Sequence, residues 1–308
     1  MVIRSQKPIL VTGSHRSGST WAGNMLSIPP AVAYVNEPFN IKYHPGTPRP
    51  HFKHWYTYVC EENEATHYEY IQDCLTYRPH ILQNTLKYGS LNEVKKQIRY
   101  QGQMLNARRT GKRPLMKDPL AILAVEWLAN TFDMEVVLLI RHPAAFVGSL
   151  MKANWPHPFD HFLQQPLLME KHLSEFESEI IKFAETEQDL VDQGILLWNI
   201  IYSVVLKYQA SYEGKWIFIK HEQISADPLH EYKLLYNRLE IPFTEHVENR
   251  IAEFSAVKPA DADSLRRDSK TVIKNWQKRL TKNEIARVKE KTERVSSQFY
   301  SAEDWVND

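Results

Sequence analysis

The chain has 308 residues, of which 43% are hydrophobic and 24% are charged, and its formal net charge is +1. This is the composition of a globular protein with enough apolar residues for a sizeable core. A net charge so close to zero excludes the broad basic field that binds nucleic acid, so any bound anion must be held by a local cluster. We therefore expect no nucleic-acid partner.

Apolar runs and cysteines indicate the compartment. The apolar run near the N-terminus is too short for a signal peptide or a membrane span, and the longest later run, residues 194–206, is interrupted by Asn199 and Ser203, which favours a core helix. The two cysteines, Cys60 and Cys74, lack the spacing of a zinc site. Two free thiols suit a reducing compartment, so we expect a cytoplasmic protein without a membrane span.

Short apolar segments alternate with helical ones along the chain. In chain order, the pattern predicts strand 8–12, helix 20–27, strand 32–35, strand 115–117, helix 120–130, strand 136–140, helix 144–152, a long helical segment within 176–208, strand 216–219 and helix 228–239. Several strands are continuous apolar runs, which is typical of a parallel sheet buried on both faces. The sequence therefore predicts one α/β domain over residues 1–308, with a central parallel sheet flanked by helices.

Two segments interrupt this alternation. Residues 40–112 and 153–175 are rich in proline, histidine and aromatic side chains. Long excursions of this kind at the functional edge of a sheet often form substrate lids, and we predict lid insertions here. Ordinary surface packing is the alternative.

A phosphate loop is predicted directly after the first strand. The segment Gly13-Ser14-His15-Arg16-Ser17-Gly18-Ser19-Thr20-Trp21 follows an apolar run and opens into a helix. Glycines allow a tight turn, and amide groups at a helix start point toward an anion. The pattern nearly matches the nucleotide-triphosphatase loop GxxxxGK[ST], but Ser19 stands at the lysine position and the cation is Arg16. The loop therefore predicts phosphate binding without a metal.

A second anion site is predicted after the strand at 136–140. Arg141 follows that strand directly, at the edge where open α/β sheets bind ligands. Ser149 lies about two turns along the next helix. Because Ala145 and Gly148 between them are small, Arg141 can reach back, and one guanidinium and one hydroxyl can share a phosphate.

These two motifs, in this order, resemble the sulfotransferase family, whose loop carries a basic residue before Ser-Gly-Thr/Ser-Thr-Trp and whose second signature is an Arg with a Ser eight residues later. The resemblance implies a P-loop-like sulfotransferase architecture, 3′-phosphoadenosine 5′-phosphosulfate (PAPS) as donor and 3′,5′-adenosine bisphosphate (PAP) as product. It implies that Arg16, Ser17, Gly18, Ser19 and Thr20 bind the 5′ end, that Trp21 stacks on adenine, that Arg141 and Ser149 bind the 3′-phosphate, and that Arg267 and Lys270 form a basic loop over it. Helix-to-sheet packing is a second role for Trp21, and a solvated charged face is the alternative for Arg267 and Lys270.

Candidate catalytic groups lie in the loop and at strand ends. By analogy with phosphoryl transfer, cations near the bridging oxygen stabilise the leaving charge, which suits Arg16 and Lys117. The acceptor hydroxyl needs a base, and Glu37 and Asp118 are the two candidates. The family's small-molecule branch uses a Lys-x-His motif that Lys117-Asp118-Pro119 does not match, which favours Glu37. Asp118 is better interpreted as the N-cap of the helix that begins near Pro119.

The sequence thus predicts metal-independent transfer of a sulfuryl group from PAPS to an acceptor hydroxyl on a carbohydrate, lipid or small alcohol. One alternative is a P-loop kinase of a small metabolite, which would require ATP and magnesium. The other is a nucleotide-binding module that has lost turnover.

Overall fold

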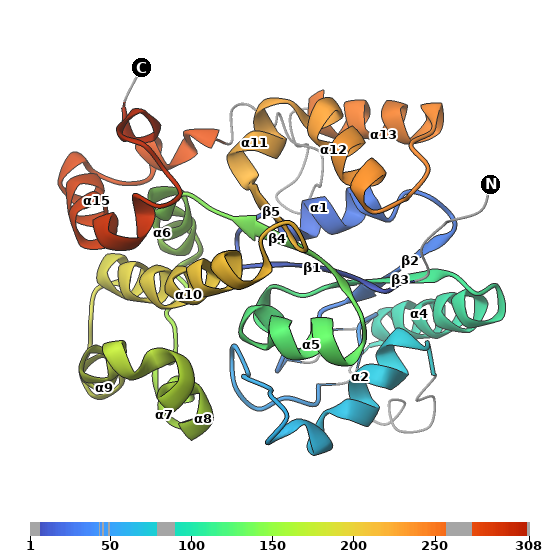
Figure 1. The fold of residues 1–308 in the computed structure, drawn as a ribbon, viewed down its shortest axis with the longest axis horizontal. Coiled ribbons are helices and arrows are strands. Elements are labelled where there is room, and N and C mark those ends of the chain that lie inside the picture. The colour runs from blue at the N-terminus through green and yellow to red at the C-terminus, as the bar shows by residue number, and fades with distance from the viewer. Residues whose placement is uncertain are drawn as a thin grey trace. The chain divides into compact units, whose positions relative to one another are not determined.

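The core of the fold is a five-stranded parallel sheet. A computed structural model describes residues 7–306 except 43, 45, 49, 79–89 and 257–272. The strand order is β2-β3-β1-β4-β5, with β1 at Ile9–Gly13, β2 at Val32–Asn36, β3 at Arg113–Lys117, β4 at Glu135–Ile140 and β5 at Ile217–Lys220 (Figure 1). All five predicted strands are confirmed to within two residues at each end.

The register of the sheet brings functional segments to one edge. In the two parallel pairs, Val11 of β1 and Asn36 of β2 both lie opposite Lys117 of β3. All five residues of β1 and all five of β3 are buried, which explains their lack of apolar–polar alternation. Because the strands are parallel, their carboxyl ends share an edge of the sheet.

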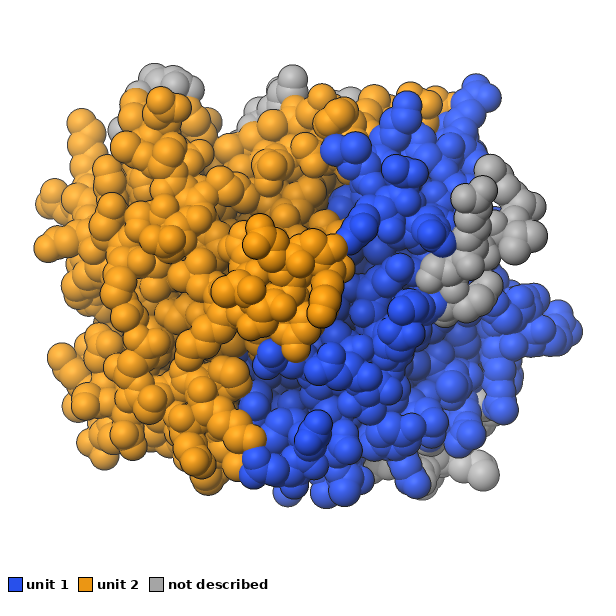
Figure 2. All heavy atoms as spheres, in the orientation of Figure 1, with its two compact units in different colours: residues 1–12, 19–137, 233–247 blue, residues 13–18, 138–232, 248–308 orange. Residues whose placement is uncertain are grey.

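The chain folds as two compact units, which Figure 2 shows in blue and orange. Unit 1 comprises residues 1–12, 19–137 and 233–247, and unit 2 comprises residues 13–18, 138–232 and 248–308. The prediction of one domain over residues 1–308 stays a prediction.

Unit 1 carries helices between its strands. They are α1 (Ser19–Leu26), α2 (Tyr68–Leu75), α4 (Leu91–Arg109) and α5 (Val125–Thr131), with short 3₁₀ helices at Glu64–Thr66 and Pro119–Ala124. The helix predicted over 120–130 therefore begins as a 3₁₀ helix. It changes to α-helix at Ala124, whose φ of −113° and ψ of 12° are not helical.

Unit 2 is largely helical. Its helices are α6 (Pro143–Ala153), α7 (Asp160–Leu163), α8 (Pro166–Leu168), α9 (Glu177–Glu185), α10 (Leu190–Tyr212), α11 (His221–Ala226) and α15 (Lys282–Ser296), with shorter helical segments at Met169–Leu173, Ser174–Phe176, Asn275–Lys278 and Ala302–Trp305. Two more helices, α12 (Pro228–Arg238) and α13 (Glu245–Ala256), include residues of both units.

The long segment predicted within 176–208 is divided into α9 and α10. Thr186 after α9 is extended, and the side chain of Asp189 caps α10 by accepting a hydrogen bond from Asp192 N at 2.8 Å. By length and composition α10 is apolar enough to cross a membrane, but 67% of its most apolar stretch is buried inside the protein. It packs against α6 and α15, as expected of a core helix.

Candidate functional site

The loop between β1 and α1 needs glycine at both ends. Gly13 has φ 148° and Gly18 has φ 92°, which favour glycine. A Cβ on Gly13 would lie 2.6 Å from the carbonyl oxygen of Leu139, and one on Gly18 would lie 2.4 Å from Nδ1 of His221. The backbone therefore turns tightly and approaches its neighbours closely, as the predicted phosphate loop requires.

Arg16 connects this loop to helix α6. It is exposed and has φ 66°, a left-handed conformation that costs a non-glycine residue free energy. Its Nε donates a hydrogen bond to Ser149 Oγ at 2.8 Å. The two predicted anion motifs are thus joined by direct contact.

Tyr202 makes a second connection between the two motifs. Its buried hydroxyl accepts a hydrogen bond from Arg141 N at 2.9 Å and lies 3.0 Å from Ser14 Oγ. The carbonyl of Arg141 accepts from Trp198 Nε1 at 2.9 Å. Burial raises the pKa of Tyr202, so its hydroxyl stays protonated. The part of Tyr202 in holding Ser14 and Arg141 was not predicted from the sequence.

Arg141 faces a carboxylate that the sequence analysis did not single out. Its Nε lies 3.7 Å from Glu222 Oε1, and Glu222 also accepts hydrogen bonds from His142 N at 3.3 Å and from the Tyr300 hydroxyl at 3.0 Å. Ser149, predicted to act with Arg141, is bonded instead to Arg16. The available signal was an acidic residue shortly after a strand: Glu222 lies two positions after β5, and the predicted base Glu37 lies directly after β2.

Ser17 Oγ in the loop and Arg141 Nε after β4 are among the buried polar atoms that lack a hydrogen-bond partner in the part of the chain that the structure describes. Buried polar atoms in proteins are nearly always hydrogen-bonded. A hydroxyl and a guanidinium in a glycine-flanked loop region are the donors that phosphate and sulfate oxygens accept from. The residues present therefore fit an anionic ligand.

Unit 1 contains the predicted catalytic pair. Lys117 is buried at the end of β3, and its Nζ forms an ion pair with Glu37 Oε1. The other carboxylate oxygen of Glu37 accepts from Asn40 Nδ2 at 2.8 Å, and Glu37 N donates to Lys117 O at 2.9 Å. Glu37 has φ 49°, so two of the predicted catalytic residues, Arg16 and Glu37, have left-handed backbones.

Asp118 is the N-cap that the sequence indicated. Its two carboxylate oxygens accept from Leu120 N at 2.9 Å and from Phe39 N at 2.6 Å, and the residue is fully buried. Burial, together with repulsion from Glu37, raises the pKa of Asp118 to about 7. Because both oxygens are occupied by backbone amides, Asp118 is a poor base for a substrate.

The remaining predicted residues lie on α1 or outside the described part of the chain. Ser19 and Trp21 are buried and Thr20 is exposed. A Cβ on Gly23 would lie 3.0 Å from the Lys117 side chain, so α1 packs closely on β3 at Gly23. Trp21, two positions earlier, lies on a different face of the helix. Arg267 and Lys270 lie outside the described residues.

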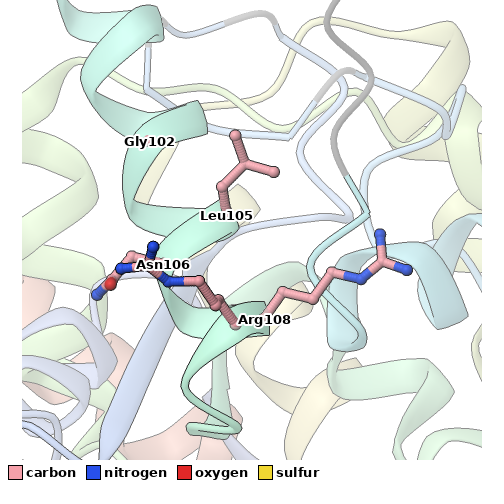
Figure 3. Close-up of a pocket in the computed structure, with 5 residues that line it drawn as sticks. Gly102, Leu105, Asn106 and Arg108 are labelled. Carbon is pink, nitrogen blue, oxygen red and sulfur yellow. The ribbon is translucent and has the colours of Figure 1, made fainter.

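Within the described ranges there is no group of three or more His, Cys, Asp or Glu residues that could hold a metal ion, and metal independence stays a prediction. A pocket of about 670 Å³ lies elsewhere, on α4, and is lined by Gly102, Leu105, Asn106, Arg108 and Arg109 (Figure 3). None of these residues was predicted as a site residue.

Comparison with known proteins decides the family. The model of the sulfotransferase family matches residues 8–245. The chain belongs to the sulfotransferase family. No curated protein sequence compared with the chain matches it.

Solved sulfotransferases have similar structures at low sequence identity. The sulfotransferase domain from the curacin biosynthetic pathway is 13% identical, with 95% of this chain and 97% of that one covered, at a TM-score of 0.53. Mouse sulfotransferase SULT7A1, solved in complex with PAP, is 12% identical, with coverage of 95% and 85% and a TM-score of 0.48. At this identity the first similarity shows the fold alone.

Proposed function

We propose that this sulfotransferase-family chain is an enzyme that transfers a sulfuryl group from PAPS to an acceptor hydroxyl on a carbohydrate, lipid or small alcohol, without a metal. The observation that carries the proposal is the direct connection of two anion motifs, through Arg16–Ser149 and through Ser14–Tyr202–Arg141. A donor with anionic groups at both its 5′ and 3′ positions matches two connected anion sites.

We assign the donor-binding residues as follows. The loop residues Arg16, Ser17, Gly18, Ser19 and Thr20 would hold the 5′ end, Trp21 the adenine, and Arg141 with Ser149 the 3′-phosphate. Arg267 and Lys270 stay proposed as contacts to the same phosphate. The hydroxyl of Ser17 and Nε of Arg141, which lack a hydrogen-bond partner among the described residues, would each donate to an anionic oxygen.

We assign the chemistry to three side chains. When bound, PAPS supplies an electrophilic sulfuryl group whose leaving phosphate gains negative charge. Lys117 and Arg16 would stabilise that charge, and Glu37 would take the proton of the acceptor hydroxyl. Glu37 is preferred to Asp118 because both oxygens of Asp118 already accept backbone hydrogen bonds. In the described structure the Glu37 carboxylate forms an ion pair with Lys117.

We also propose a cytoplasmic location. Neither Cys60 nor Cys74 forms a disulfide, which suits a reducing compartment.

Calorimetric titration with PAP, and in parallel with ATP plus magnesium, tests the donor class. We expect tight binding of PAP without added metal and weak binding of ATP. Tighter binding of ATP with magnesium would contradict the proposal and favour the kinase alternative.

Substitution of the proposed base tests the catalytic step. Glu37→Gln removes the proton acceptor and keeps the shape of the side chain, so we expect the turnover rate to fall by about 100-fold or more while PAP affinity is retained. The measurement is PAP release from PAPS with a panel of sugars, sterols and simple alcohols. Exposed Glu61→Gln is the matched control, and equal rates in the two variants would refute the assignment of Glu37.

A further inference from the structure

Helix α4 exposes three large apolar side chains in a line. Leu91, Ile98 and Leu105 are 82%, 66% and 45% exposed. They are seven residues apart, close to two helical turns, so they share one face over about 21 Å of helix. Apolar residues that are exposed singly need no explanation, whereas three on one face of one helix are a candidate interaction surface.

The opposite face of α4 is well anchored. Gln97, Met104 and Ala107 are buried, and Gln97 Oε1 accepts a hydrogen bond from Gly46 N at 3.0 Å. Ser90 caps the helix by accepting from Glu93 N. The exposed line therefore belongs to a capped helix with its own contacts within unit 1.

Four of the five cations of α4 lie on or beside the face of the apolar line, and Lys96 lies on the other side of the helix. Five basic residues of α4 are exposed, and Glu93 is the helix's single acid. None of the five forms an ion pair with a residue that the structure describes. They are Lys95, Lys96, Arg99, Arg108 and Arg109.

We propose that this face of α4, the line Leu91, Ile98 and Leu105 with its flanking cations, docks on an anionic lipid surface. A second copy of the chain would bring the same cations against these, and like charges repel. A lipid surface provides the complementary charge, and long Lys and Arg side chains reach its head groups while the apolar residues enter the interface.

The pocket on α4 supports a lipid as the occupant. The residues that line it include Leu105, Arg108 and Arg109, and Figure 3 shows Leu105 and Arg108 on α4. Guanidinium groups bind phosphate well, and an adjacent leucine suits the start of an acyl chain. The pocket thus offers phosphate and apolar contacts at one end of the exposed line.

Co-sedimentation of the full chain with vesicles tests this proposal. We expect binding to phosphatidylcholine vesicles that contain phosphatidylserine, weaker binding at high salt, and little binding to pure phosphatidylcholine. The variant Lys95→Glu/Arg99→Glu should lower the partition constant at least about tenfold. The control Lys53→Glu/Lys215→Glu makes the same change of net charge at exposed positions outside α4 and should bind nearly as well as the wild type.

A second variant tests the apolar line. Ile98→Ser should lower the partition constant by about tenfold, whereas Leu234→Ser, at another exposed leucine on α12, should leave it unchanged. All these positions are exposed, and circular dichroism checks the fold.

Three outcomes would overturn the proposal. The chain could show no preference for anionic vesicles, or the α4 variant and its control could lose vesicle binding equally. The third outcome is a dimer that Ile98→Ser dissociates without changing vesicle binding. Binding to polyglutamate while the vesicles are ignored would also overturn it and assign the face to an acidic protein segment.

Discussion

The hydroxyl of Tyr202 is a single buried group that holds two parts of the candidate site. It bonds to Arg141 N and to Ser14 Oγ. A phenylalanine at position 202 would keep the packing of the ring and leave a buried amide without its acceptor. The cost of an unpaired buried group is larger than the average worth of a hydrogen bond.

We therefore expect Tyr202→Phe to lower the free energy of unfolding by about 1–3 kcal/mol and to weaken PAP binding. Urea denaturation measures the first effect and calorimetry the second. The control Tyr68→Phe removes an exposed hydroxyl and should change stability by less than about 0.5 kcal/mol. Equal urea midpoints for the two variants would show that the hydrogen bonds of the Tyr202 hydroxyl do not stabilise the fold.

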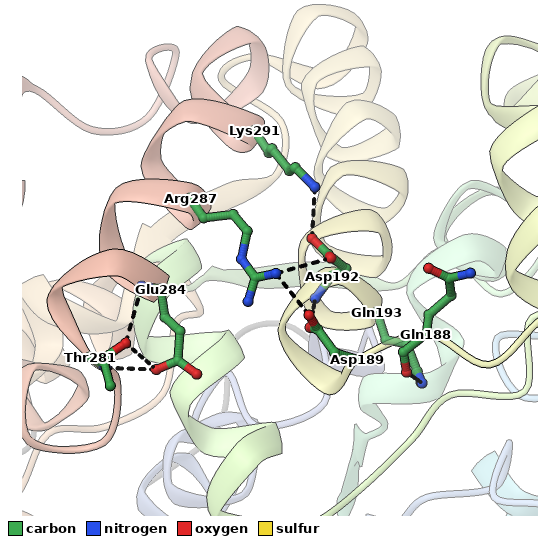
Figure 4. A network of polar contacts seen from close by, with 8 residues as sticks. All are labelled: Gln188, Asp189, Asp192, Gln193, Thr281, Glu284, Arg287 and Lys291. Atoms are coloured by element: carbon green, nitrogen blue, oxygen red, sulfur yellow. Dashed lines mark hydrogen bonds and ion pairs between the residues drawn. The ribbon is translucent and has the colours of Figure 1, made fainter.

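At the scale of elements, α10 and α15 are joined by a charged network. Arg287 of α15 pairs with Asp189 at 2.8 Å and with Asp192 at 3.2 Å, and Lys291 pairs with Asp192 at 2.8 Å (Figure 4). Asp189 also caps α10. The network is partly exposed, so its contribution to stability is modest and depends on salt.

We expect Arg287→Ala to lower the free energy of unfolding by about 1 kcal/mol at low ionic strength, and by less in high salt. Urea denaturation at two salt concentrations measures the effect. Lys7→Ala is the control, because the Lys7–Asp133 pair is more exposed and should contribute less. An Arg287→Ala effect that does not depend on salt would indicate lost packing instead of lost charge.

At the scale of the whole molecule, histidines with lowered pKa values should make the stability depend on pH. Burial lowers the pKa of His15 to about 3 and that of His142 to about 4. The half-buried His67 and His172 are also lowered to about 4, mainly by burial. Between these values and about 6.5, the unfolded chain binds more protons, so stability falls as the pH falls. The pKa of Asp118 is raised to about 7. Below that pH the folded chain therefore binds the extra proton, and Asp118 makes stability rise as the pH falls.

We expect the histidines together to have a larger effect on stability than Asp118, so the free energy of unfolding should decrease from pH 6.5 to pH 4. The decrease is about 1.4 kcal/mol per pH unit for each proton that the unfolded chain binds in excess of the folded chain. Urea denaturation across this range measures the slope. His142→Phe should reduce the slope by the contribution of about one proton, because it removes one titrating histidine. The variant keeps an aromatic ring to stack against Trp276. Exposed His230→Gln is the control, and identical slopes for both variants would contradict this account.

Structural features that depend only on neighbouring residues could be predicted from the sequence. The apolar runs predicted all five strands, the loop with Arg16 and the later Arg141–Ser149 motif together indicated the family, and Asp118 before Pro119 was correctly interpreted as an N-cap. Strand propensity, tight turns and helix caps are set within a few residues of the chain, so no knowledge of distant contacts was needed.

Contacts between distant residues were decided by the tertiary structure. Arg16 and Ser149 are 133 positions apart, and Ser14 and Tyr202 are 188 apart. The same holds for Glu222 beside Arg141. The sequence by itself determined which donors follow each strand. The packing of α6, α10 and the segment after β5 determined which of them meet, because a side chain's partner depends on the position of other elements and not on its own neighbours in the chain.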